Sequence, residues 1–92
     1  MKKDKIKEEV NKTVDEFAEE MKRVLLSPKN IIKGNSWKTM DIDSLKHHLR
    51  SEYAEWRDSE EMNEEESDRR ELIDIANICM MLWHRTKEGI EK

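Results

Sequence analysis

The residues of this chain best suited to chemistry are two pairs of carboxylates, Glu52 with Glu55 and Glu71 with Asp74. Each pair is spaced three residues apart, so on a helix both members lie on one face, about one turn apart. Carboxylates clustered near an apolar core repel one another and resist burial, and a divalent cation removes both problems. Because all-oxygen ligation suits Mg²⁺ or Mn²⁺ better than zinc, the pattern predicts a magnesium site at these four residues.

Three helices are expected to position these acids. The first runs from about Lys5 to Leu26, within an N-terminal segment of residues 1–27, and its apolar positions follow a narrow helical stripe. They are Val10, Val14, Phe17, Met21 and Val24. Pro28 ends this helix, because proline disfavours the helical conformation of the residue before it. Residues 28–40 are expected to form a connector.

The other two helices are predicted to form an antiparallel hairpin over residues 41–88. One helix runs from about Asp41, its N-cap, to Asp58. The other runs from near Asn63, an N-cap with Glu66 as its reciprocal partner, to about Glu88, with Gly89 just beyond its end. In an antiparallel hairpin, residues at one level have a constant sum of positions. Glu52 with Asp74 and Glu55 with Glu71 both add to 126, so the two acidic pairs should face each other.

Composition favours one small all-α domain covering residues 1–92. The chain is 43% charged, with two Gly and one Pro, and no segment alternates polar and apolar residues as a strand would. The net charge of −4 argues against a nucleic-acid binder, and no apolar run approaches the ~20 residues of a membrane span. Cys79, Trp56 and Trp83 have core spacing and are interpreted as buried packing residues, with Cys79 reduced in a cytoplasmic environment.

The acidic motifs resemble the signature of the MazG-like all-α nucleoside triphosphate pyrophosphohydrolases, a superfamily that includes the dimeric dUTPases. The matching text is Glu52-Tyr53-Ala54-Glu55 and Glu71-Leu72-Ile73-Asp74, continuing as Ile75-Ala76-Asn77. The similarity covers roughly residues 36–83. Ser51 stands where many members have a further glutamate, which leaves the subgroup and the number of metal ions open.

This resemblance implies antiparallel helices whose subunits associate, as a homodimer or homotetramer, to complete a four-helix-bundle core. It implies Mg²⁺ bound by Glu52, Glu55, Glu71 and Asp74, and attack of water on the α-phosphorus of a nucleoside triphosphate with pyrophosphate leaving. Glu52 or Glu55 is the candidate base. A metal ion lowers the pKa of a bound water and neutralises negative charge on the phosphates, so this chemistry is physically reasonable.

Three further residues are candidates for binding the substrate. Trp37 can stack on a base and Lys38 can meet a phosphate, or they can close the core and face solvent. Asn77, three residues after Asp74, can bind a phosphate or sugar oxygen, or simply face water. His47, His48 and His84 are interpreted as surface or structural residues.

The sequence thus favours a cytoplasmic, Mg²⁺-dependent hydrolase that converts a nucleoside triphosphate to the monophosphate and pyrophosphate. Two alternatives remain. One is a non-enzymatic helical interaction module whose first helix pairs with a partner while its acids face solvent. The other is a carboxylate-bridged iron protein.

Overall fold

The computed structural model describes residues 2–60 and 65–90, and within these ranges it contains helices and no strand. Helix α1 spans Lys2–Leu25, α2 spans Pro28–Lys33, the short 3₁₀ helix η1 spans Ser36–Lys38, α3 spans Ile42–Glu60 and α4 spans Glu65–Ile90. The predicted all-α class is therefore confirmed for the described residues. The predicted four-helix core concerns the association of several chains and stays a prediction.

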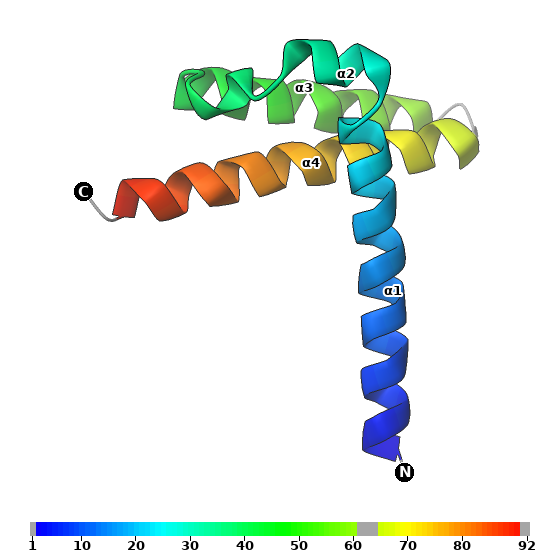
Figure 1. The fold of residues 1–92 in the computed structure, drawn as a ribbon. Coiled ribbons are helices and arrows are strands. Elements are labelled where there is room, and N and C mark those ends of the chain that lie inside the picture. Colours follow the sequence, from blue (N-terminus) through cyan, green and yellow to red (C-terminus); the bar gives the residue numbers. More distant parts are fainter. Residues whose placement is uncertain (1, 61–64, 91–92) are drawn as a thin grey trace.

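Helices α3 and α4 lie side by side and antiparallel, as Figure 1 shows. Their contact buries Leu45 on α3 and Ile73 and Ile78 on α4, which are 2%, 8% and 8% exposed. At the start of α3 the backbone N–H of Ser44 donates to Oδ2 of Asp41 at 3.3 Å, the N-cap bond expected at this residue. The hairpin is therefore the part of the chain that has a hydrophobic core.

The segment predicted as a connector, residues 28–40, is instead largely helical. Pro28 is the first residue of α2, where its fixed φ angle suits a helix and its missing N–H costs nothing. Gly34 follows α2 with a φ of 60°, a conformation that favours glycine. Arg85 of α4 then holds η1 by donating from Nη1 to the carbonyls of Trp37 at 2.8 Å and Met40 at 2.6 Å.

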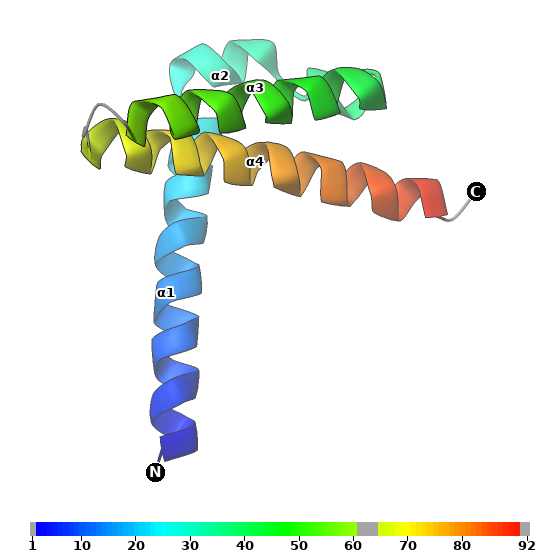
Figure 2. The same ribbon diagram turned by 180° about the vertical axis from the view of Figure 1, so that it is seen from behind.

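Helix α1 projects away from the hairpin at a steep angle, and only its C-terminal part approaches α4 (Figures 1 and 2). None of its residues is buried. The radius of gyration is 15.6 Å, whereas a compact domain of this length would have about 12 Å. The apolar stripe predicted to pack on another helix is thus largely uncovered within a single chain.

Several predictions about individual residues are wrong. Cys79 and Trp83, expected in the core, lie on an exposed face of α4, with Trp83 66% exposed. The spacing identified the apolar side of α4 but not the part of that side that α3 covers. Helix α4 also continues through Gly89 to Ile90, because one glycine in the last turn lowers helix propensity without ending the helix.

The N-cap predicted at Asn63 lies outside the described residues. Over the described ranges, the search for membrane spans finds no helix that is both long and apolar enough to cross a bilayer.

Candidate metal centre

The hairpin brings together the four acids that the sequence singled out. Glu52 and Glu55 lie on α3, Glu71 and Asp74 lie on α4, and the two helices pack against each other. The Glu52 side chain is only 18% exposed. Asp74 and Glu71 are half-buried, while Glu55 is exposed. The acids therefore extend from the helix interface to the surface.

Glu52 is affected electrostatically by each of the other three acids. Burial raises its pKa most, and the charges of Glu55 and Asp74 raise it further. A side-chain hydrogen bond with Glu55 and the charge of Glu71 act in the same direction, so the pKa of Glu52 rises from 4.5 to about 7. Such a rise follows when a carboxyl is both desolvated and surrounded by like charges. Glu52 and Asp74 are expected to be close, because they lie at one level of an antiparallel hairpin.

The pKa of Asp74 is also affected by burial, but cationic side chains lie near this residue. Burial raises its pKa and the charge of Glu55 adds to the rise, while Arg70, Lys29 and His48 oppose it. Arg70 lies one turn before Asp74 on α4, Lys29 comes from α2, and His48 comes from α3. The acidic cluster is thus flanked by positive groups on three different helices.

Lys29 was not among the candidate site residues, and His48 was interpreted as a surface or structural residue. His48 is mostly exposed, but its Nε2 is 3.8 Å from Oε1 of Glu52, one helical turn away. The spacing of four residues is a signal that the sequence contained. No helical spacing in the sequence indicated Lys29, because its approach to Asp74 depends on α2, which forms in the segment predicted as a connector.

Among the described side chains, no three His, Cys, Asp or Glu residues converge closely enough to hold a metal ion. Carboxylates repel one another, and the repulsion favours rotamers that keep their oxygens apart. The four acids therefore interact electrostatically without forming a preassembled ligand cage. Their chemistry still fits a hard divalent cation, since the donors are all oxygens and their like charges resist burial.

Trp37 and Lys38 lie at a different level of α4 from the acids. The ring of Trp37 makes an edge contact with His84 at 5.6 Å between centroids, and Nζ of Lys38 lies 5.7 Å from the Trp37 ring. His84 is ten residues after Asp74, which is roughly 15 Å along a helix. The structure therefore places these two candidates beside the C-terminal half of α4, apart from the carboxylates.

Asn77 lies where α4 crosses α1, and it is only 4% exposed. Its Nδ2 donates to the carbonyl of Met21 at 3.5 Å, a long hydrogen bond. Its Oδ1 is buried and has no hydrogen-bond partner among the described residues. Asn77 thus contacts α1 rather than the surface strip on which the sequence placed it.

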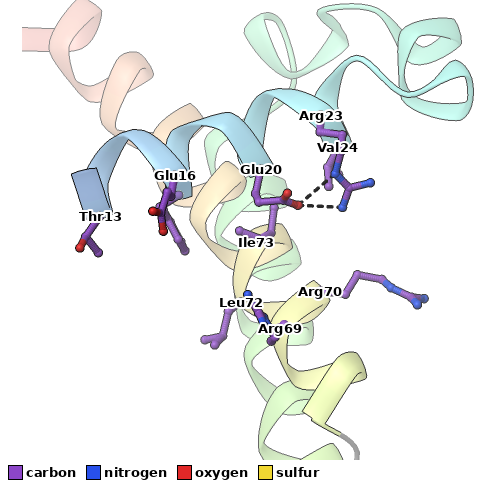
Figure 3. Close-up of a pocket in the computed structure, with 10 residues that line it drawn as sticks. Thr13, Glu16, Glu20, Arg23, Val24, Arg69, Arg70, Leu72 and Ile73 are labelled. Atoms are coloured by element: carbon purple, nitrogen blue, oxygen red, sulfur yellow. Dashed lines mark hydrogen bonds and ion pairs between the residues drawn. The ribbon is translucent and has the colours of Figure 1, made fainter. Parts of the chain in front are cut away.

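A hollow in the described surface is a separate feature. It is an open groove of about 690 Å³ between α1 and the start of α4 (Figure 3). The lining residues come from both helices: Thr13, Glu16, Phe17, Glu20, Arg23, Val24, Arg69, Arg70, Leu72 and Ile73. None of the four acids lines it, so the groove is not the candidate metal centre.

The chain was compared with protein-family models, curated proteins and solved structures. No protein-family model matches the chain. Neither a curated protein nor a solved structure matches it.

Proposed function

We propose that the chain is a Mg²⁺-dependent hydrolase that cleaves a nucleoside triphosphate to the nucleoside monophosphate and pyrophosphate, as its resemblance to the MazG-like enzymes suggests. The observation that carries the proposal is that the packing of α3 against α4 puts Glu52 within electrostatic range of Glu55, Glu71 and Asp74. A helix interface rarely accumulates buried like charges without a compensating cation.

The proposed ligands are Glu52, Glu55, Glu71 and Asp74, and Mg²⁺ is the proposed ion, with Mn²⁺ as a substitute. When bound, the cation supplies neutralisation of the phosphate charge and a lowered pKa for a nearby water. Water attacks the α-phosphorus, and the bond from that phosphorus to the oxygen bridging to the β-phosphorus breaks. The electron pair leaves with pyrophosphate. Glu52 or Glu55 accepts the proton of the attacking water.

Two cationic side chains, Lys29 and Arg70, have a role in the proposed hydrolysis. Lys29 and Arg70 are close enough to act on the charge of Asp74, which supports a role for them in neutralising the phosphates of a substrate held by the acids. Trp37, Lys38 and Asn77 stay as predicted substrate contacts. Of these, Trp37 and Lys38 belong to the η1 end of the hairpin, and they would contact the base or sugar rather than the α-phosphate.

The test is pyrophosphate release from a panel of ribo- and deoxynucleoside triphosphates with Mg²⁺. Glu55→Gln and Asp74→Asn should each lower kcat/KM by roughly 100-fold or more, because even residues that only support a metal ligand typically cost 10–100-fold. Glu9→Gln on α1 and Asp43→Asn at the start of α3 are matched controls on exposed residues, and they should retain activity. Mg²⁺ should also raise the melting temperature of the wild type but not of Asp74→Asn.

The alternative function, a non-enzymatic interaction module, is favoured by one observation: the apolar stripe of α1 is exposed. Absence of turnover for every triphosphate, together with no stabilisation by Mg²⁺ or Mn²⁺, would support the module and contradict the hydrolase. A visible chromophore on adding iron would instead support the carboxylate-bridged iron protein.

A further inference from the structure

Helix α1 presents an apolar stripe that the single chain does not cover. Ile6, Val10, Val14 and Phe17 are 59%, 54%, 58% and 43% exposed. These positions recur at helical spacing on one face, which is the pattern of a helix that packs against another. Only the end of the stripe, at Met21 and Val24, is partly covered.

The groove between α1 and α4 continues this stripe. Phe17 and Leu72, 43% and 42% exposed, contribute apolar surface, and Glu16 and Glu20 provide acidic groups along the α1 side (Figure 3). An apolar surface bordered by charged groups is typical of a surface that binds another chain. Its shape follows a helix axis, because α1 itself forms one wall.

The charges of α1 are unevenly distributed along its length. Its first two turns carry four lysines, Lys2, Lys3, Lys5 and Lys7, whereas its later turns carry four acids, Asp15, Glu16, Glu19 and Glu20. Two parallel copies of α1 would align lysines with lysines and acids with acids. Two antiparallel copies would align each lysine-rich end with an acidic segment, which is the complementary arrangement.

The apolar stripe and the charges select the same antiparallel register. Centring the stripe places Ile6 opposite Phe17 and Val10 opposite Val14, so that facing positions add to 23 or 24. In this register Lys3 comes level with Glu20, Lys5 with Glu19 and Lys7 with Glu16, by the same sums.

Glu8 and Glu9 come level with Asp15 and its neighbours, which is unfavourable. Arg69 and Arg70 of α4 line the groove that this segment of the partner enters, and they carry the opposite charge.

We propose that α1 pairs antiparallel with α1 of a second copy, and that the N-terminal half of the partner helix lies in the groove between α1 and α4. Each groove then holds residues 2–11, approximately, of the other chain. In each copy the partner's α1 packs beside α1 and α4. The pairing uses none of the four acids of the candidate metal centre, and the two proposals share only Arg70, which lines the groove and acts on Asp74.

The first test is sedimentation of the full chain between about 1 and 100 μM. The wild type should be a dimer, and Val14→Lys should be a monomer with unchanged helical circular dichroism, since Val14 is not part of the hairpin core. Ile32→Lys is the matched control, because Ile32 is 87% exposed on α2 and lies outside the stripe. A monomeric wild type, or a dimer that Val14→Lys does not weaken, would contradict the proposal.

Charge exchange tests the direction of pairing. The double variant Lys5→Glu with Lys7→Glu and the double variant Glu16→Lys with Glu19→Lys should each raise the dimer dissociation constant roughly tenfold, because like charges then face each other. An equimolar mixture of the two should restore wild-type affinity as a heterodimer. If each variant alone dimerised as well as the wild type, the helices would be parallel and the proposal would be wrong.

A lipid surface is the competing occupant of an exposed amphipathic helix. The wild type should therefore show no binding to vesicles of phosphatidylcholine with phosphatidylserine. Monomers that bind such vesicles through α1, with binding lost in Val14→Lys, would replace the dimer with a membrane contact.

Discussion

The α3–α4 hairpin and helix α1 are built from the same kind of sequence but have opposite environments. All three elements are long amphipathic helices, of 19, 26 and 24 residues for α3, α4 and α1. The described buried residues, Leu45, Ile73, Asn77 and Ile78, all belong to the hairpin, and α1 contains none. Hydrophobic spacing therefore determines which side of a helix is apolar, whereas the tertiary contact determines whether that side is covered.

The contrast has a functional side as well. The covered helices hold the acidic cluster, where burial shifts the pKa of Glu52 and Asp74. The uncovered helix holds charges that face solvent at both ends. The hairpin therefore has carboxyl groups whose pKa is shifted by burial, whereas α1 has an exposed apolar stripe.

The largest effect should come from removing the best-buried side chain of the hairpin. Leu45→Ala deletes a side chain that is 2% exposed, so it should lower the free energy of unfolding by roughly 2–5 kcal/mol. Val10→Ala, on the uncovered stripe, should cost far less in dilute solution, and its cost should grow with protein concentration if α1 pairs.

Urea unfolding at two protein concentrations measures both effects. If Leu45→Ala does not fold, Leu45→Val gives a smaller cavity for the same comparison. Equal, concentration-independent losses for the Leu45 and Val10 variants would mean that α1 is packed as firmly as the hairpin, and the contrast between the two regions would disappear.

A smaller effect is expected from the charge of Glu52. Its pKa is about 7 in the folded chain and 4.5 in the reference state, so between pH 4.5 and 7 the unfolded chain releases a proton that the folded chain keeps. Stability from this group is therefore full below pH 4.5, falls as the pH rises, and levels off above about 7. Glu52→Gln cannot ionise, so it should be about 2 kcal/mol more stable than the wild type at pH 8 and equal to it near pH 4.5.

Thermal melts from pH 4.5 to 8 with a chelator present measure this difference. Asp43→Asn at the start of α3 is the matched control and should follow the wild type at every pH, because Asp43 is exposed and lies outside α1. A Glu52→Gln variant that is less stable than the wild type at pH 8 would show that the carboxylate is stabilised, not strained, in the hairpin.

Much of the hairpin was predictable from the sequence. The i, i+3 acids and the constant sum of 126 predicted that Glu52 would face Asp74 and that Glu55 would face Glu71, and in the structure the charge of Asp74 acts on Glu52. Leu45 and Leu49 are four residues apart, the spacing that predicts one face of a helix, because an apolar face repeats every three to four residues. Local patterns were sufficient here because the two helices are neighbours in the chain and joined by a short segment.

The rest depended on contacts between distant segments. Lys29 and Trp37 took their places through α2 and η1, whose position is set by Arg85 nearly fifty residues later. Cys79 and Trp83 have the spacing of core residues, yet both are exposed among the residues that the structure describes. A single-helix pattern contains no information about how far a neighbouring helix extends over it, so burial at these positions was not predictable.

The smallest effect is expected at Asn77, where the two regions meet. Its Oδ1 is buried without a hydrogen-bond partner among the described residues, and its Nδ2 makes only a 3.5 Å bond to the carbonyl of Met21. A buried acceptor without a partner is costly, so Asn77→Leu, which has a similar volume, should raise stability by about 1 kcal/mol. Asn30→Leu is the contrasting variant: it loses a 2.8 Å bond to the carbonyl of Val24 and should lower stability by a similar amount.

Differential scanning calorimetry of both variants, with nucleotide turnover measured alongside, separates the two interpretations of Asn77. A more stable Asn77→Leu that keeps full turnover would make Asn77 a polar residue trapped where α1 crosses α4. A more stable variant that loses turnover would support the predicted contact of Asn77 with the substrate, since a folding defect could not explain the loss. A less stable variant would mean that Oδ1 has a partner in solution, such as an ordered water between the two helices.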